Sequence, residues 1–110
     1  NFRGGIYAYS DNSMAFVNSS GSWSFRVNND KTTTHWNHAV PHTNNSYDLG
    51  TSSYRWRNVY TNDLNLSNEG GSNDVDSTWG SYTIQEGAED LFLINKRNGK
   101  KYKFNLTEVS

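Results

Sequence analysis

The first thirty residues alternate short apolar runs with short polar runs. The apolar runs GIYA, MAFV and SWSFRV begin eight or nine residues apart, and clusters of Asp, Asn, Ser and Gly separate them. In the third run Trp23, Phe25 and Val27 alternate with Ser24 and Arg26, the period-two pattern of a half-buried strand. Short strands that recur with such turns predict an antiparallel β-meander, and no stretch longer than two turns has helical periodicity.

The segment YDLGTSSYRWRNVYTNDLNL, residues 47–66, concentrates large side chains in a polar background. Its adjacent serines suit the start of one helical turn, on which Trp56, Val59 and Tyr60 would share a face. Beyond that turn the pattern is strand-like, with Leu64 and Leu66 on one face.

The last forty residues predict a strand and a β-hairpin. The run STWGSYTIQEG predicts a strand, and residues 90–109 predict a hairpin whose two-residue turn is Asn98-Gly99, the pair typical of a type I′ turn. This register places Leu93 opposite Phe104. One face of the hairpin would then carry Leu91, Leu93, Tyr102, Phe104 and Leu106, and the other Phe92 and Ile94 against Lys103 and Asn105.

Composition adds that one chain has too little apolar material for a large core. Hydrophobic residues make up 33% of the 110 residues and aromatic residues 15%, while the net charge is only -1. Low charge and many aromatic residues favour an ordered chain, whose core would depend on Trp, Tyr and Phe. We therefore expect neighbouring chains to complete the burial, because oligomerisation is a common remedy for a thin core.

Charge and cysteine content limit the partners. Residues 61–90 hold seven acidic residues and no Lys or Arg, whereas residues 91–110 hold five basic residues and one acidic residue. The pI of 6.3 argues against nucleic acid as a partner. No apolar run approaches 18 residues, so we expect no membrane insertion. The absence of cysteine excludes disulfides and thiolate metal sites.

Candidate chemistry is weak throughout the chain. His35 and His38 would point to opposite faces of a strand, so one chain cannot chelate a metal with both, although a three-fold axis would gather three copies of one histidine. The frequent carboxylates, among them Asp74 and Asp76, lie in Gly/Ser/Asn-rich stretches, and no nucleophile–base motif or calcium-loop spacing occurs. We expect no catalytic residues, no metal site, no cofactor and no enzyme activity.

The segment LGTSSYRWRNVY resembles the Leu-Gly-x-x-x-x-Arg-Trp-x-x-Val-Tyr segment near the C-terminal ends of phage tail fibres and tailspikes. The matching residues are Leu49, Gly50, Arg55, Trp56, Val59 and Tyr60. In that family such segments build intertwined homotrimers around a central three-fold core. The resemblance implies an all-β fold of short-stranded meander and hairpins in an elongated, intertwined homotrimer.

The chain departs from that family at the self-cleaving chaperone domain that often follows the segment. That domain carries a catalytic Ser-Asp pair with a nearby Lys, followed by long helices. Here the only Ser-Asp pair is Ser10-Asp11, which lies upstream of the segment, and no Lys follows before Lys31. We therefore expect no self-cleavage.

The resemblance also divides the chain and implies its partners. We expect a β-meander fibre or head segment at residues 1–46, a trimer-core segment at 47–68 and a C-terminal hairpin tip at 69–110. The implied function is a distal, trimerising and host-recognition domain in the virion, outside the cell, with itself and a host surface glycan or protein as partners. The predicted trimer-core residues are Leu49, Tyr54, Trp56, Val59, Tyr60, Leu64 and Leu66. The predicted host-contact residues are Trp79, Tyr82, Arg97, Lys100 and Lys101.

A monomeric β-sandwich carbohydrate-binding module is the alternative interpretation. Exposed Trp and Tyr side chains on an all-β fold suit stacking against sugars, and Trp36, Trp79 and Tyr82 are the plausible platforms. The two interpretations differ in oligomeric state, because such a module would be a compact monomer.

Overall fold

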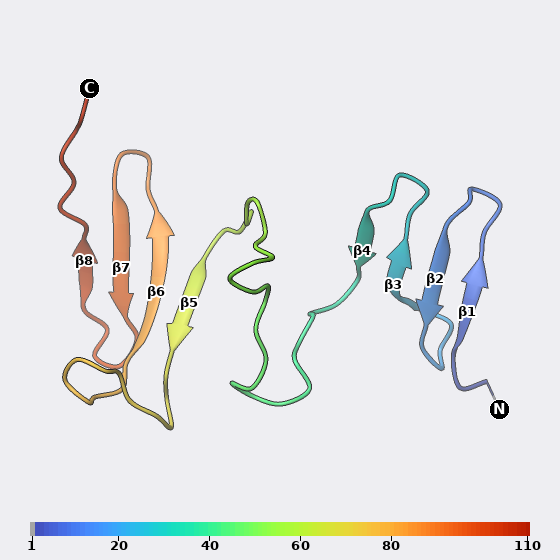
Figure 1. The fold of residues 1–110 in the computed structure, drawn as a ribbon, viewed down its shortest axis with the longest axis horizontal. Coiled ribbons are helices and arrows are strands. Elements are labelled where there is room, and N and C mark those ends of the chain that lie inside the picture. Colours follow the sequence, from blue (N-terminus) through green and yellow to red (C-terminus); the bar gives the residue numbers. More distant parts are fainter. Residues whose placement is uncertain (1) are drawn as a thin grey trace. The chain divides into compact units, whose positions relative to one another are not determined.

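The computed structural model describes residues 2–110, and in that range the chain forms eight β-strands and no helix. The predicted all-β fold is confirmed. The chain divides into two compact units, one up to Ser52 and one from Ser53 onward. Each unit holds one four-stranded antiparallel sheet (Figure 1). No helix in the described range could span a lipid bilayer.

The first sheet is the predicted meander. Its strands pair in chain order and run antiparallel to one another. They are β1 (Gly5–Ala8), β2 (Met14–Val17), β3 (Trp23–Val27) and β4 (Thr33–His35). The strands begin nine or ten residues apart, which leaves room for one tight loop between each pair.

One turn geometry closes all three loops of this sheet. In each loop a residue accepts a backbone hydrogen bond from the residue three positions later and donates one to the residue four positions later. The accepting residues are Tyr9, Asn18 and Asn28, with N···O distances of 2.9–3.1 Å. The fourth residue of each turn has a positive φ: Asn12 at 65°, Gly21 at 76° and Lys31 at 75°. Such loops combine a type I turn with a residue in the left-handed region.

A bulge in the first sheet alters the predicted face of Trp23. The β2–β3 register shifts between Phe16 and Val17, so that Trp23 pairs with Val17 while Phe25 pairs with Phe16. Phe25 packs against the Phe16 ring, whereas Trp23 contacts Tyr9 instead. The strict alternation expected from the sequence is therefore wrong at Trp23, because a bulge re-aims the side chain beside it.

The second sheet comprises β5 (Leu64–Ser67), β6 (Ser81–Glu86), β7 (Leu91–Asn95) and β8 (Lys101–Lys103). These strands also pair in chain order, and every pair is antiparallel. The predicted strands around Leu64 and around Ile84 are confirmed, as is the hairpin.

The register of that hairpin differs from the prediction by two residues. Leu93 lies opposite Tyr102 rather than Phe104, and the N–H of Asn95 donates to the carbonyl of Lys100 at 2.8 Å. The loop therefore spans four residues, and of its two predicted turn residues only Gly99 has a positive φ, 75°. The physical cause is the Asn95 side chain, which accepts the Arg97 N–H at 2.9 Å and starts the turn early. A displacement of two leaves every side chain on its predicted face.

The predicted helical turn beyond Ser52 is wrong. Residues 51–60 contain bends but neither helix nor strand. Nucleating a helix fixes several dihedral angles for a single hydrogen bond, so a short turn forms only when packing supports it. Within this chain the segment lacks that packing, because its large side chains are exposed.

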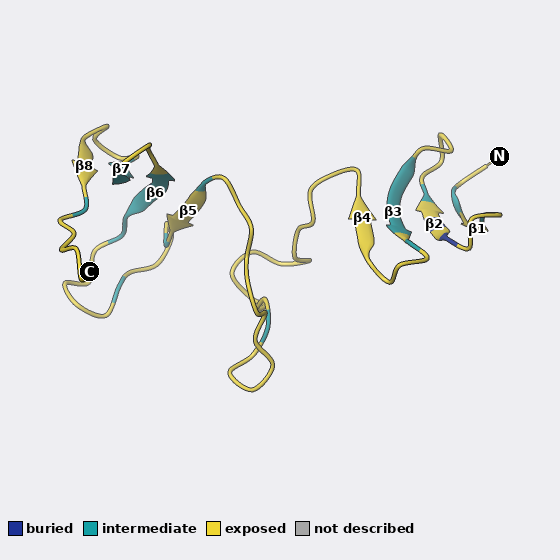
Figure 2. Cartoon of the chain, turned by 90° about the horizontal axis from the view of Figure 1, so that it is seen from above, coloured by how far each residue is buried: buried dark blue, intermediate teal, exposed yellow. Residues whose placement is uncertain are grey.

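The hydrophobic core within one chain is minimal. In residues 2–110 Ala15 is the only fully buried hydrophobic residue, accompanied by buried Ser13 and Thr83. Partly buried residues are found mainly in the strands of the two sheets, and nearly all of the rest is exposed (Figure 2). Each unit is thus a single layer with both faces largely open.

Candidate interaction surfaces

The predicted trimer-core residues of the 47–60 segment are strongly exposed in the single chain. Leu49 is 79% exposed, Trp56 67% and Tyr60 92%, and Tyr54 and Val59 are comparably open. A soluble chain rarely leaves so many large apolar side chains together in water. Each of these side chains is therefore available for another molecule to cover.

The two predicted core leucines of β5 belong to one face of the second sheet. The pairing register lines up Leu64 with Ile84, Leu93 and Tyr102 across all four strands. Leu66 lies beside Tyr82 on the same face. Leu64, Leu66 and Tyr102 are each about half exposed, so no second layer of this unit covers the row. We call this face, which also carries Leu91 and Phe104, the leucine face.

The first sheet also has an apolar face. Its register aligns Ile6, Phe16, Phe25 and His35 across the four strands. The Phe16 and Phe25 ring centroids are 5.6 Å apart, and the Phe25 and His35 centroids 5.0 Å apart. Ile6 and Phe16 remain exposed.

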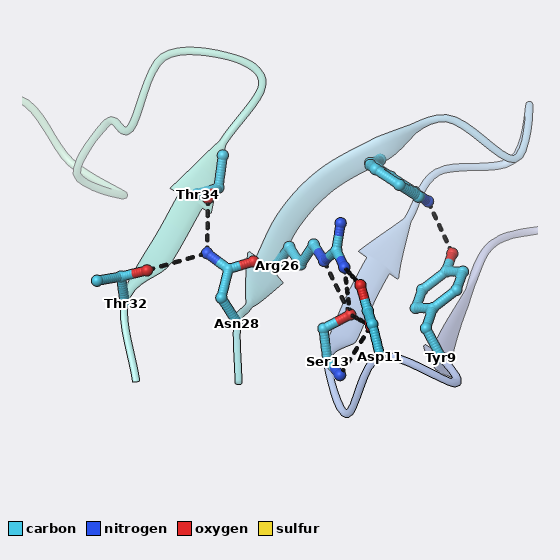
Figure 3. Close-up of polar contacts among 8 residues, drawn as sticks. Tyr9, Asp11, Ser13, Arg26, Asn28, Thr32 and Thr34 are labelled. Atoms are coloured by element: carbon cyan, nitrogen blue, oxygen red, sulfur yellow. Dashed lines mark hydrogen bonds and ion pairs between the residues drawn. The ribbon is translucent and has the colours of Figure 1, made fainter. Parts of the chain in front are cut away.

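The opposite face of the first sheet is held by polar and aromatic contacts (Figure 3). Arg26 donates to the Ser13 hydroxyl at 2.9 and 2.6 Å and forms an ion pair with Asp11. Its guanidinium lies over the Trp23 ring, 5.0 Å from the centroid, and Trp23 Nε1 donates to the Tyr9 hydroxyl at 2.7 Å. These contacts join β3 to the loop between β1 and β2.

The Arg26 network was not predicted, although the sequence carries a signal for its loop. Asp-x-Ser/Thr occurs at residues 11–13, 30–32 and 76–78. In each copy the Asp carboxylate accepts both the N–H and the hydroxyl of the Ser or Thr two positions later, at 2.5–3.1 Å. The middle residue has a positive φ each time. A repeated tripeptide of this kind marks a loop that is closed by its own side chains.

These hydrogen bonds lower the pKa of all three carboxyls. The Ser13 hydroxyl is the main cause for Asp11, with a smaller contribution from Arg26. For Asp30 the main cause is the Thr32 hydroxyl, and for Asp76 it is the Thr78 hydroxyl followed by the Asn73 amide. Asp76 is thereby occupied with its own loop, and in residues 2–110 no three His, Cys, Asp or Glu side chains converge as a metal site would require.

The structure brings together part of the predicted host-contact set. The Arg97 guanidinium stacks on the Trp79 ring, 3.8 Å from its centroid, and Arg97 Nη1 donates to the Trp79 carbonyl at 3.0 Å. Trp79 and Tyr82 also line an open hollow of about 610 Å³ together with Asn68 and Asn73. Aromatic and amide groups of this kind suit a polar ligand with a stackable face.

The two predicted lysines lie elsewhere. Lys101 is opposite Ile94, and the register puts Ile94 on the face opposite to Tyr82. Lys100 follows the hairpin loop, and neither lysine lines the hollow. The predicted host-contact residues therefore do not form one group. Arg97 stacks on Trp79, Lys101 lies on the face opposite to Tyr82, and Lys100 lies opposite Asn95, in the row of Tyr82.

Comparisons of the chain with protein-family models, curated proteins and solved structures found no match.

Proposed function

We propose that this chain is a C-terminal, distal segment of a phage tail fibre that trimerises the fibre and contacts the host cell surface. In this proposal its partners are two further copies of itself and a surface glycan or protein of the host. It acts on the outside of the virion, without catalysis and without a cofactor.

The observation that carries the proposal is the amount of surface left uncovered, which includes large side chains such as Trp56 and Tyr60. The chain exposes 10153 Å². Two separate compact units, each of half the 12.5-kDa mass, would together expose about 7,400 Å². The excess, roughly 2,700 Å², exceeds what one partner contributes to most specific interfaces, about 800 Å². Contacts with several copies account for that excess better than a lone chain does.

The resemblance at Leu49–Tyr60 also supports a trimeric fibre segment. Four of the residues that match the fibre segment are also among the most exposed large hydrophobic side chains of residues 2–110, namely Leu49, Trp56, Val59 and Tyr60. Three copies around an axis would bury one another's Trp56 and Tyr60 and leave the Asn-, Ser- and Thr-rich surface in water. This arrangement answers why so polar a chain keeps large aromatics in one short segment.

Light scattering coupled to size exclusion tests the trimer. The purified 110-residue chain at micromolar concentration should have three times the 12.5-kDa mass of one chain. A folded monomer at that concentration contradicts the proposal.

Host contact is tested separately, with fluorescently labelled protein and a panel of bacterial strains. We expect saturable binding to particular strains, competed by unlabelled protein. Binding to none of a broad panel, or equal binding to all, contradicts a receptor-specific role. Replacing Trp79 by Ala should reduce that binding, while Val75→Ala, in the same loop region, serves as the matched control.

The monomeric carbohydrate-binding module remains the second candidate, because the hollow beside Trp79 suits a sugar. Against it stands the single-layer construction, since neither unit contains the second sheet of a sandwich. A monomeric chain that binds a glycan array would favour the module over the fibre.

A further inference from the structure

The second sheet ends in two unpaired edges. β5 pairs only with β6, and β8 only with β7, so these strands form the two borders of the sheet (Figure 1). The bonds from Asn95 N–H to the Lys100 carbonyl and from Phe104 N–H to the Leu91 carbonyl fix which groups of β8 face β7. Because facing residues alternate in an antiparallel pair, the backbone groups of Lys101 and Lys103 point away from the sheet.

The same reasoning applies to β5. The Asn68 N–H donates to the Gly80 carbonyl at 3.3 Å, which continues the β5–β6 pairing. By alternation the backbone groups of Asn65 and Ser67 point away from β6. Unpaired edges such as these are templates for another strand, and proteins ordinarily cover them.

The number of strands makes the two edges compatible. Four antiparallel strands leave β5 and β8 running in opposite directions. Rotation about an axis parallel to the strands preserves these directions, so β8 of one copy would meet β5 of the next copy antiparallel. At both edges the residues whose backbone groups point away from the sheet are odd-numbered. Their side chains lie on the other face of the sheet from the leucine face. The leucine face would therefore continue unbroken from copy to copy.

Side chains at the two edges are complementary as well. Lys103 lies opposite Phe92, which lies opposite Gln85, and Gln85 Nε2 donates to Asp63 Oδ2 at 3.1 Å. One row across the sheet thus ends in a cation at the β8 edge and an anion at the β5 edge. The next row along the strands ends in Tyr102 at one edge and Leu64 at the other. Both rows join in a single register, which places Lys103 opposite Asp63 and Tyr102 opposite Leu64.

We infer that β8 of one copy pairs antiparallel with β5 of the next copy in this register. The second sheets of the three copies would then join into one closed ring with the leucine face inside. The inference rests on the proposed homotrimer and specifies its contact. The interface is head-to-tail, and after three copies the ring closes and leaves no free edge. It also covers the half-exposed row that begins at Leu64.

Disulfide trapping in the full chain tests this pairing, and the absence of native cysteine makes any cross-link unambiguous. In the variant Asp63→Cys with Lys103→Cys, the two thiols of one chain lie three strand spacings apart, about 14 Å. A disulfide needs Cα atoms within about 7 Å, so only thiols from different copies can join. The matched controls are Asp63→Cys alone and Lys103→Cys alone, because a head-to-tail contact does not bring like positions together.

Under mild oxidation the double variant should give covalent species that end at three chains on a non-reducing gel, and each single variant should stay uncross-linked. A trimer by light scattering with no cross-link in the double variant overturns the edge pairing and leaves the proposed trimer standing. A ladder beyond three chains overturns the closed ring. If light scattering finds a monomer, both the proposed trimeric function and this edge contact are contradicted.

Charge exchange provides a second, independent readout. Asp63→Lys should raise the trimer dissociation constant by about fivefold per interface, since exposed ion pairs are worth up to about 1 kcal/mol. Adding Lys103→Asp in the same chain should restore the original value. Equal weakening in the single and the double variants overturns the pairing of these two residues.

Discussion

At the scale of single residues, three of the loops share one hydrogen-bonding arrangement. An Asp side chain closes the turn by accepting the N–H and hydroxyl of the Ser or Thr two positions later, and the residue between them adopts a positive φ. Asp11 also forms an ion pair with Arg26, whereas only the hydrogen bonds of its own loop lower the pKa of Asp30. Local hydrogen bonds of this type allow loops to hold their shape without a hydrophobic core beneath them.

These carboxyls make stability fall in acid. Their pKa values lie below the ordinary 3.8, so each Asp supports the fold above that pH and loses its contribution as the pH falls through its still lower folded pKa. We expect the melting temperature to drop on acidification below about pH 4. Melts recorded by circular dichroism at several pH values check this. The triple variant Asp11→Asn, Asp30→Asn and Asp76→Asn should flatten the acid limb, and an unchanged limb contradicts the assignment.

Lys31 tests whether the β3–β4 loop has the same backbone requirement as the β2–β3 loop. Its φ of 75° matches that of Gly21 in the preceding loop, but a lysine in the left-handed region is disfavoured. Lys31→Gly should therefore stabilise the chain by roughly 0.5–1 kcal/mol, measured by urea denaturation. Lys31→Val is the opposing control and should destabilise, because a branched side chain resists this conformation. Destabilisation by glycine would show that the loops are not equivalent.

At the scale of strands and hairpins, sequence pattern predicted where elements lie but not their register. The alternation at Phe25 and Val27 located β3, and the spacing of turn residues located the meander. The bulge that re-aims Trp23 left no mark in that alternation. In the C-terminal hairpin the Asn98-Gly99 pair suggested a two-residue turn, yet the Asn95 side chain intervened and lengthened the loop. Side-chain hydrogen bonds to the backbone decide such cases, and a residue-type pattern does not contain them.

The hairpin loop depends on Gly99. Its φ is 75°, and a Cβ added there meets no atom within 4 Å, so backbone conformation alone sets the penalty. Gly99→Val should destabilise by about 1–2 kcal/mol, and Lys96→Val in the same loop by less. Denaturation curves of the two variants make the comparison. Equal effects would mean that the loop tolerates a left-handed valine, contrary to this account.

At the scale of the whole molecule, composition indicated that one chain could not bury its own apolar side chains, and the structure agrees residue by residue. Ala15 is the only fully buried hydrophobic residue among residues 2–110. The sequence also singled out Trp56 and its neighbours. It could not predict that both sheets would be single layers, because that outcome depends on which strands pair.

Trp56 distinguishes a lone chain from an assembly. In the single chain it is 67% exposed, so Trp56→Ala would barely affect a monomer. In the proposed trimer it should weaken the assembly by about 3–5 kcal/mol per chain, as truncation of a buried aromatic does. Sedimentation equilibrium checks the association. Val75→Ala is the control, since Val75 is 95% exposed outside the segment. Equal association of the two variants contradicts a core role for Trp56.

The open apolar faces have a kinetic consequence. In the proposed trimer the sheets would gain most of their burial from other copies, so folding and association would become one concerted reaction. Refolding should then accelerate with protein concentration, and the melting temperature should rise with it, unlike those of a self-sufficient domain. Dilution would act on such a molecule as a denaturant does. The native state of that trimer would depend on the protein concentration as much as on the sequence of the chain.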